Sequence, residues 1–438
     1  KRVAVAGLSG GGWQTIFISS LDPRGTLANP VAGYSSFLTR IDEIADLGDS
    51  EQTPTDMATI ADYTHLTALR APRPTLLTYN ASDQCCFVAN GALPPLLKAV
   101  EPIYLLLGQR SNLRTHVNYL PGDHNFGLDN RLQLYRMFGE HFFPGDKDYR
   151  YDEIPSDDEV KSADELKVAL PEENATFSSL AAGLAARLPR SAALPPPADL
   201  ESWQAEFREE LRAVCHFHDY AVDAMAAGER TIPGGVARFW KLKTGKAWTV
   251  PATELSPVQA SSTVVLIADE GRRSTTEEAN RLYEAGHRVI AVDLFHFGEA
   301  QGDERPSLYA LLVSCIGQRP VGIQASQLAA VARWAKGDRH EGVAVRATGR
   351  QTTLVALIAG ALEPAAIQKT TVRDSLATLK QVIEENLGVQ HFPNLFCYGL
   401  LEHFDVKQLT ALHIPREVRF EDASERAKQE LAELAELY

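Results

Sequence analysis

The sequence feature that most constrains this chain is a serine placed between a strand pattern and a helix pattern. Residues 3–8 are small and apolar, which predicts a buried strand, and residues 11–21 carry the spacing of a helix. The segment Gly7-Leu8-Ser9-Gly10-Gly11 joins the two as a G-x-S-x-G motif. A serine at such a turn is held in a strained conformation with its hydroxyl exposed, and small residues two positions to either side avoid clashes. The motif therefore predicts that Ser9 is a nucleophile.

The glycine after this serine fits a second part of the same chemistry. Gly10 opens the predicted helix, so its backbone N–H is aimed to stabilise negative charge on a substrate oxygen. A phosphate-binding loop is a poorer interpretation, because neither the Lys-Ser/Thr pair of a P-loop nor a G-x-G-x-x-G pattern is present. The structural alternative is a glycine-rich turn in which Ser9 only caps the helix.

An activated serine needs a base, and the base needs a carboxylate to orient it. Residues 75–80 form a predicted strand, and Asp83 lies three residues beyond it. Residues 117–120 form another predicted strand, and the loop that follows it contains His124. The chain order of serine, acid and histidine is the one expected after a nucleophile turn of this kind. We therefore predict a triad of Ser9, Asp83 and His124.

Other candidates for these roles fit less well. Asp123 adjoins His124, and adjacent residues in one loop rarely point at each other's side chains. His116 and His141 lie before and after the expected loop. The pair Cys85-Cys86 follows the acid and is interpreted as small buried residues, with the alternative that one pairs with a cysteine outside this sequence.

Strand and helix patterns alternate along the chain in two blocks. This alternation predicts the α/β class, with mostly parallel sheets and helices on both faces. We expect a first domain over residues 1–145, an acidic and proline-containing linker over 146–200, and a second domain over 201–438. In the second block, helices are expected at 203–226 and 324–335, and strands around 236–250 and at 343–347.

Residues 1–145 resemble the α/β-hydrolase superfamily from its nucleophile strand to its last helix. The wider pattern is similar to a bacterial acetyl-xylan-esterase-like group, through the motif that ends in Gly12-Trp13, the loop Asp83-x-Cys85-Cys86 and Asp123-His124-Asn125. This resemblance implies hydrolysis of a carboxylic ester through an acyl-enzyme, without metal or organic cofactor. It also implies an acetylated sugar or polysaccharide as substrate.

The start of the chain departs from that family. It begins at Lys1, without a methionine and inside the predicted strand. In the family, the first strands and the loop that supplies the second oxyanion N–H precede the nucleophile strand. We therefore expect a truncated first domain from a longer protein, and the activity of this chain alone stays open. No signal peptide can be sought, so the compartment is open too, although secretion or a periplasmic location fits the resemblance.

The second half resembles a degenerate copy of the same fold. Residues 343–353 parallel residues 3–11, and matching Gly349 with Gly7 puts Gln351 in the place of the serine. Glutamine has no oxygen of useful nucleophilicity. Asp422 is a possible counterpart of Asp83, but no histidine follows in the matching place. The sequence therefore predicts a second hydrolase-like domain without a triad.

Composition excludes several other functions. The chain carries 43 basic and 57 acidic residues, a net charge of −14, which argues against nucleic acid or an anionic membrane as partner. The longest apolar stretch, near residues 354–362, is about half as long as a membrane span. Five cysteines without a C-x-x-C pair argue against a zinc knuckle or a disulfide scaffold. His216-x-His218 is an unfavourable metal pair.

Three functions compete. The first is a serine carboxylic ester hydrolase acting on a small-molecule or carbohydrate ester. The second is a serine peptidase similar to prolyl oligopeptidase, which would share the triad but would not be expected to carry a second hydrolase-like unit. The third is a non-catalytic binding protein with a hydrolase fold, because the second half has already lost its nucleophile.

Overall fold

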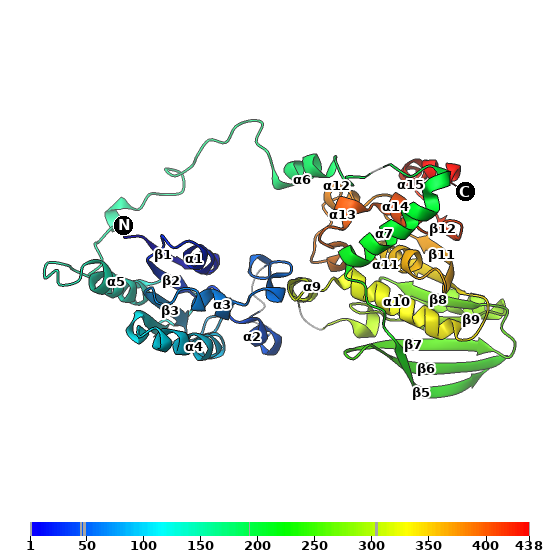
Figure 1. Ribbon diagram of the computed structural model, residues 1–438, viewed down its shortest axis with the longest axis horizontal. Coiled ribbons are helices and arrows are strands. Elements are labelled where there is room, and N and C mark those ends of the chain that lie inside the picture. The colour runs from blue at the N-terminus through cyan, green and yellow to red at the C-terminus, as the bar shows by residue number, and fades with distance from the viewer. Residues whose placement is uncertain (1, 44–45, 47–49, 192, 303–304, 438) are drawn as a thin grey trace. The chain divides into compact units, whose positions relative to one another are not determined.

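The computed structural model describes residues 2–43, 46, 50–191, 193–302 and 305–437. The chain divides into two compact units (Figure 1): residues 1–174 together with 314–317, and residues 175–313 together with 318–438. The boundary after residue 174 lies inside the segment that the sequence marks as a linker. Each unit contains its own sheet and helices, so the α/β class predicted from the sequence is confirmed.

The first unit contains a four-stranded sheet in which all strands are parallel and follow chain order. The strands are β1 (Ala4–Leu8), β2 (Leu27–Val31), β3 (Thr75–Asn80) and β4 (Leu113–Asn118). The helices are α1 (Gly10–Leu21), α2 (Phe37–Asp42), α3 (Tyr63–Ala68), α4 (Ala89–Leu106) and α5 (Leu128–Phe142). Leu134 and Met137 of α5 pack against Leu27 and Leu76 of the sheet, where they form a small apolar core.

Helix α4 is longer than its composition suggests, because it contains Pro94, Pro95 and Pro102. Proline removes a helical hydrogen bond and normally breaks a helix interior. Burial offsets that loss here, since one face of α4 carries six buried residues: Ala89, Ala92, Leu93, Leu96, Val100 and Tyr104. Apolar packing, rather than helix propensity, therefore keeps this segment helical.

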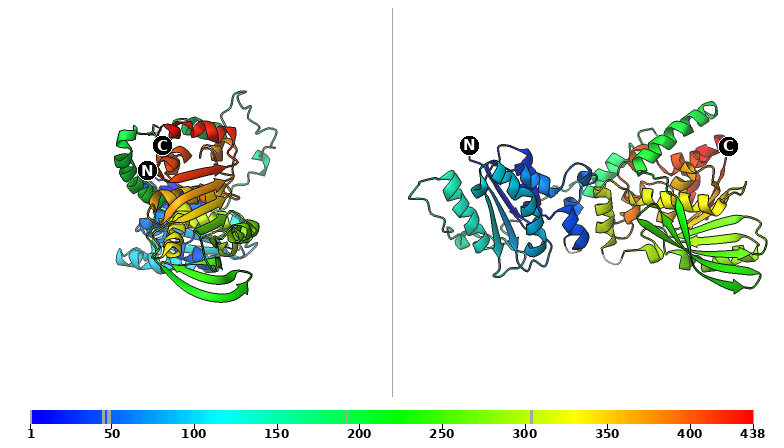
Figure 2. Two further views of the ribbon diagram at one scale, coloured as in Figure 1. Left: turned by 90° about the vertical axis from the view of Figure 1, so that its right-hand side faces the viewer. Right: turned by 60° about the horizontal axis from the view of Figure 1, so that its bottom comes forward.

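The second unit contains an eight-stranded sheet in the order β12-β11-β10-β8-β9-β7-β6-β5. Strands β12, β11, β10, β8 and β9 run parallel to one another, whereas β7 pairs antiparallel with β9, and β5, β6 and β7 form antiparallel hairpins at one end. Figure 2 shows these hairpin strands in green beside the rest of the twisted sheet. The strands are β5 (Val222–Ile232), β6 (Gly235–Thr244), β7 (Trp248–Pro257), β8 (Thr263–Ala268), β9 (Arg288–Val292), β10 (Val343–Thr348), β11 (Ile367–Arg373) and β12 (Glu417–Glu421).

Two buried helices form the centre of the second unit. They are α10 (Pro320–Lys336) and α11 (Arg350–Leu362), and almost every residue of α11 is inaccessible to solvent. The remaining helices are α6 (Phe177–Ala185), α7 (Leu200–Cys215), α8 (Thr276–Glu284), α9 (Pro306–Cys315), α12 (Gln381–Glu384), α13 (Leu400–His403), α14 (Val406–Ala411) and α15 (Glu425–Glu430). A large apolar cluster joins α10 and α11 to the central strands.

One expected helix is wrong over part of its length. The helix predicted over residues 203–226 ends at Cys215, where His216 takes a left-handed conformation with φ 49°. Residues 222–232 instead form β5, which pairs along its length with β6. Alanine, methionine and glutamate in this segment favour a helix locally, but hairpin pairing overrides that preference.

Candidate active site

The turn between β1 and α1 holds Ser9 in an unusual backbone conformation, with φ 58° and ψ −120°. A positive φ is uncommon for a residue with a side chain and costs about 1–3 kcal/mol. Two backbone hydrogen bonds fix it: Ser9 donates to the carbonyl of Val31 (2.9 Å), and its own carbonyl accepts from Trp13 (2.9 Å). The Ser9 side chain makes no capping hydrogen bond to α1. The interpretation of Ser9 as a helix cap is therefore wrong.

Glycines make this close approach of strand and helix possible, although not all those expected. A Cβ on Gly7 would lie 2.6 Å from the backbone of Gly11, and one on Gly12 would lie 2.6 Å from the carbonyl oxygen of Val31. A Cβ on Gly11 itself would meet nothing within 4 Å. Position 7, two residues before the serine, therefore has to be glycine. After the serine, the position that has to be glycine is Gly12 and not Gly11.

Gly10, the expected oxyanion donor, is the first residue of α1, so its N–H has no acceptor within the helix. The space beside it is partly taken by an acid. A Cβ on Gly10 would lie 3.6 Å from Oε1 of Glu51. The helix N-terminus that would stabilise an oxyanion therefore already faces one carboxylate.

Asp83 and His124 are in direct contact. His124 Nδ1 lies 2.8 Å from Oδ2 and 3.0 Å from Oδ1 of Asp83. The Asp83 side chain is fully buried, and that of His124 is 18% exposed. The Asp83 carboxylate also accepts the backbone N–H groups of Cys85 (3.0 Å) and Cys86 (3.2 Å). These contacts leave Nε2 as the ring nitrogen of His124 that is free to take a proton.

The three predicted residues follow β1, β3 and β4, and the carboxyl ends of parallel strands lie at one edge of a sheet. Asp83 and His124 meet at that edge, beyond β3 and β4. Ser9 follows β1, at the opposite end of the strand order β1-β2-β3-β4. Among the described residues no hydrogen bond joins Ser9 Oγ to His124. Catalytic contacts of this kind are often long without substrate and tighten in the Michaelis complex.

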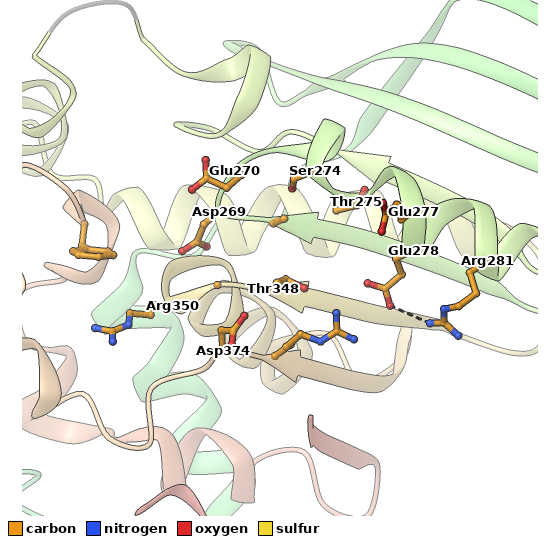
Figure 3. Close-up of a pocket in the computed structure, with 14 residues that line it drawn as sticks. Asp269, Glu270, Ser274, Thr275, Glu277, Glu278, Arg281, Thr348, Arg350 and Asp374 are labelled. Carbon is orange, nitrogen blue, oxygen red and sulfur yellow. Dashed lines mark hydrogen bonds and ion pairs between the residues drawn. The ribbon is translucent and has the colours of Figure 1, made fainter. Parts of the chain in front are cut away.

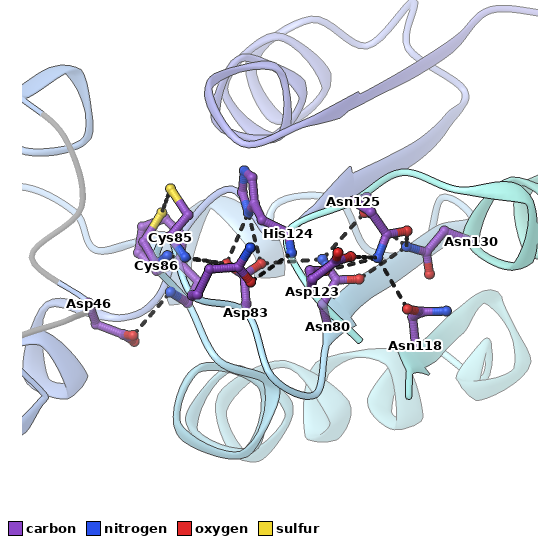
Figure 4. Close-up of polar contacts among 12 residues, drawn as sticks. Asp46, Asn80, Asp83, Cys85, Cys86, Asn118, Asp123, His124, Asn125 and Asn130 are labelled. Carbon is purple, nitrogen blue, oxygen red and sulfur yellow. Dashed lines mark hydrogen bonds and ion pairs between the residues drawn. The ribbon is translucent and has the colours of Figure 1, made fainter. Parts of the chain in front are cut away.

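A buried asparagine network supports the acid and the histidine loop (Figure 4). Asn80 donates to Asp83 Oδ2 (3.2 Å), and Asn130 donates to Asn80 Oδ1 (3.1 Å). Asn118 accepts from Asn125 (3.2 Å) and from the N–H of Gly122 (2.9 Å) in the loop that carries His124.

Sequence reasoning missed this network. Part of the signal was available, because the strand predicted over residues 75–80 ends in Asn80. Asn118 lay inside the strand predicted over residues 117–120, whereas the observed strand ends at Asn118. In the structure Asn80 and Asn118 are paired across β3 and β4, and both are buried.

The residues that the sequence ranked lower make other contacts. Asp123 Oδ1 accepts from Asn125 (3.0 Å), and His116 Nε2 lies 2.8 Å from Asp129. Cys85 is exposed and Cys86 is buried, with their sulfurs 3.3 Å apart, so the two side chains are in contact without being joined in a disulfide. The cysteine pair matters to the site through its backbone, because its N–H groups hold Asp83.

The second unit repeats the strand–turn–helix with a glycine at the turn. β10 ends at Thr348, α11 begins at Arg350, and Gly349 between them has φ 112°. Gly349 donates to the carbonyl of Arg373 (3.0 Å) and accepts from Thr353 (3.1 Å), the same two bonds that Ser9 makes. Gly349 rather than Gln351 therefore occupies the nucleophile position, so the predicted alignment was wrong by two residues.

A carboxylate fills the anion position of this second turn. Asp269 follows β8 and accepts the N–H groups of Gln351 (3.1 Å) and Thr352 (2.7 Å). A Cβ on Gly349 would lie 2.3 Å from Asp269 Cγ. Burial raises the pKa of the Asp269 carboxyl, against the two N–H groups that lower it. Figure 3 shows Asp269 at the ends of the central strands, near Arg350.

The remaining expectations concern metals, membranes and Asp422. Among the described residues no group of three His, Cys, Asp or Glu side chains is arranged to hold a metal ion. In the same part of the chain, no helix is long and apolar enough to cross a membrane. The Asp422 side chain is 82% exposed and lies 3.9 Å from Arg373, so it does not orient a histidine as Asp83 does.

No protein family profile and no curated protein matches this sequence. Among solved structures, a Bacteroides fragilis protein assigned as an acetyl xylan esterase matches 60% of this chain and 81% of its own, with TM-score 0.50 and 15% identity. An acetyl xylan esterase from Paenibacillus sp. R4 covers 56% of this chain and 96% of its own, with TM-score 0.37 and 11% identity. A glucuronoyl esterase from Solibacter usitatus covers 57% and 87%, with TM-score 0.38 and 13% identity. The first likeness shows the fold, which is that of the α/β-hydrolases.

Proposed function

We propose that this protein is a serine carboxylic ester hydrolase in which Ser9 is the nucleophile, His124 the base and Asp83 the acid that orients it. The observation that carries the proposal is the contact between buried Asp83 and His124 at the sheet edge where Ser9 sits with positive φ. A strained serine and an oriented imidazole are the two parts that acyl transfer requires.

The reaction proceeds in two halves. Ser9 Oγ attacks the ester carbonyl carbon while His124 Nε2 takes the hydroxyl proton, and Asp83 stabilises the imidazolium. The N–H of Gly10 donates to the oxyanion of the tetrahedral intermediate. The intermediate collapses to an acyl-serine as His124 returns the proton to the leaving alcohol. Water then attacks the acyl-serine by the same route in reverse, releasing the acid and free Ser9.

We infer an acetylated sugar or polysaccharide as the substrate class. The support is the fold shared with a protein assigned as an acetyl xylan esterase. Neither the triad geometry nor the fold separates esters from peptides, because both are acyl transfers from a carbonyl carbon. The substrate test therefore needs both classes side by side.

A fluorophosphonate probe tests the nucleophile directly. The full chain is labelled in parallel with Ser9→Ala and with a control, Ser111→Ala, whose side chain is exposed near β4. We expect labelling of the wild type and the control and none of Ser9→Ala. Wild-type protein that is folded by circular dichroism yet unlabelled would refute the proposal. Labelled protein is then assayed on acetylated xylose and on prolyl peptides, and cleavage of the peptides alone would replace esterase by peptidase.

A further inference from the structure

The second unit contains a cavity of about 350 Å³ at the end of its central strands. It adjoins the larger cavity of about 660 Å³ shown in Figure 3, since Asp269, Glu270 and Phe392 line both. Pockets for small ligands span roughly 300–1,000 Å³, so the smaller cavity has room for one compact molecule. It lies beside the start of α11, because Gln351, two residues after Gly349, is one of the residues that line it.

The lining of this cavity has a distinctive chemistry. It includes the side-chain amides of Gln301, Gln351, Gln390 and Asn394, together with two imidazoles, two carboxylates and the rings of Phe297 and Phe392. Arginine and lysine are absent from the described lining. Amides and imidazoles both donate and accept hydrogen bonds, as hydroxyl groups do. The lining therefore favours a neutral, hydroxyl-rich ligand over an anion.

Nδ1 of His296 and Oδ1 of Asn394 make no hydrogen bond of normal geometry to the described residues, although the two side chains lie close enough to interact with each other. His296 is 7% exposed and Asn394 is 3% exposed. Gln351 Oε1 accepts from the side-chain amide of Asn394 (2.9 Å), which fixes that amide and leaves its oxygen unused. A buried polar group without a partner costs about 1–3 kcal/mol. A ligand hydroxyl would supply the missing bonds.

The backbone at His296 adds a second cost. His296 has φ 67°, and its ring stacks on Phe295 with centroids 4.0 Å apart. Strained residues of this kind tend to lie at ligand sites, where the surrounding structure holds them in place. Burial lowers the pKa of His296 to about 4, with Asn394 opposing the shift, so the imidazole is neutral at neutral pH. A neutral ring can accept from a sugar hydroxyl or donate to one.

We propose that this cavity is a non-catalytic binding site for one sugar residue, held through its hydroxyls by His296, Gln351 and Asn394 and through its C–H face by Phe392. The site is separate from Ser9 and does not require the proposed esterase activity.

The test uses the full chain carrying Ser9→Ala, so that ester hydrolysis cannot contribute to the measured binding signal. D-xylose, xylotriose and D-glucuronate are titrated by calorimetry and by saturation-transfer NMR. We expect saturable binding of xylose and xylotriose, and weaker binding of glucuronate because no cation in the described lining can pair with its carboxylate. Absence of saturable binding by folded protein, or tighter binding of glucuronate than of xylose, would overturn the proposal.

Two variants locate the site, and a third serves as a control. Asn394→Ala and His296→Phe should each weaken xylose binding at least tenfold, the effect of losing one buried hydrogen bond. His296→Phe keeps the ring that stacks on Phe295 and removes an unpartnered nitrogen, so its melting temperature should equal or exceed that of the parent. The control, Gln109→Ala, alters an exposed amide in the first unit. Binding unchanged in both site variants would rule out this cavity.

Discussion

The two strand–turn–helix segments share their backbone geometry and differ in what lies at the helix N-terminus. Ser9 and Gly349 make the same pair of backbone hydrogen bonds, one to the next strand and one within the helix. In the second unit the carboxylate of Asp269 accepts two N–H groups of α11. In the first unit α1 begins at Gly10, and the Ser9 side chain accepts no hydrogen bond from the N–H groups at this helix end. The two turns therefore share a backbone scaffold and differ in the residue at the turn and in the group at the helix N-terminus.

The two turns also differ in the strands that flank them within the described residues. β10 lies between β11 and β8, so the loop after β8 brings Asp269 next to α11. β1 forms an edge of the described four-stranded sheet, and its single neighbour in that sheet is β2. Glu51 approaches Gly10 from a different segment of the chain.

The largest expected effect comes from giving the first turn the residue of the second. Ser9→Gly should lower ester hydrolysis roughly a millionfold, as removal of a nucleophilic serine does. It should leave folding intact and raise stability by up to about 1 kcal/mol, because glycine adopts positive φ without strain. Urea denaturation and a p-nitrophenyl acetate assay measure the two effects. A Ser9→Gly protein that fails to fold would break the comparison.

The acid provides the next largest effect. Asp83→Asn should reduce kcat about 10⁴-fold, because the amide can no longer hold the imidazole in the tautomer that accepts the serine proton. Asp123→Asn is the matched control, since Asp123 bonds Asn125 rather than His124. Steady-state kinetics on an acetyl ester separates the two variants. Equal losses in both would mean that the loop as a whole, and not Asp83, carries the effect.

The reverse exchange should create no enzyme. Gly349→Ser places a Cβ against Asp269 at a φ of 112°, and overpacking with backbone strain should destabilise the second unit by about 2–5 kcal/mol. In a Ser9→Ala background it should gain no fluorophosphonate label. Adding Asp269→Gly should recover part of the stability. A Gly349→Ser protein that is stable and labelled would show that the second turn can hold a reactive serine despite Asp269.

The sequence was sufficient to predict features that depend on strand order and local motifs. It was not sufficient for those that depend on contacts between distant residues. The contact of Asp83 with His124 follows from loops placed after two adjacent parallel strands. The register of the second turn was wrong because glycine was matched with glycine, whereas the strand end at Thr348 sets the alignment. Asn80 donates to Asp83 and accepts from Asn130, a partner 50 residues away that no local pattern reveals.

Two buried histidines should make the second unit sensitive to acid. Burial lowers the pKa of His413 to about 3 and that of His296 to about 4. Below about pH 6.5 the unfolded chain takes up protons that these folded sites refuse, so stability falls by about 1.4 kcal/mol per pH unit for each histidine as pH drops toward 4. Above about pH 6.5 these histidines are neutral in both the folded and the unfolded chain, so this loss of stability is absent.

Tryptophan fluorescence reports this acid effect, since the second unit contains Trp203, Trp240, Trp248 and Trp334. Urea midpoints between pH 4 and 7 should show a smaller slope for His296→Phe than for the parent. Gln109→Ala, which alters an exposed and non-titrating side chain in the first unit, is the control and should leave the slope unchanged. Equal slopes in parent and His296→Phe would contradict the assignment of the acid response to that residue.

The smallest expected effect tests whether Glu51 is a weak counterpart of Asp269. Its carboxylate lies near Gly10, where the proposed reaction develops negative charge. Repulsion from a partly exposed charge at such a distance should raise the free energy of the transition state by about 0.5 kcal/mol. Glu51→Gln should therefore raise kcat/KM about twofold, with less dependence on salt because the repelling charge is gone. Glu101→Gln, in α4, is the control. A fall in kcat/KM would instead mean that Glu51 contacts the substrate, and the first turn would then share nothing with the second beyond its backbone.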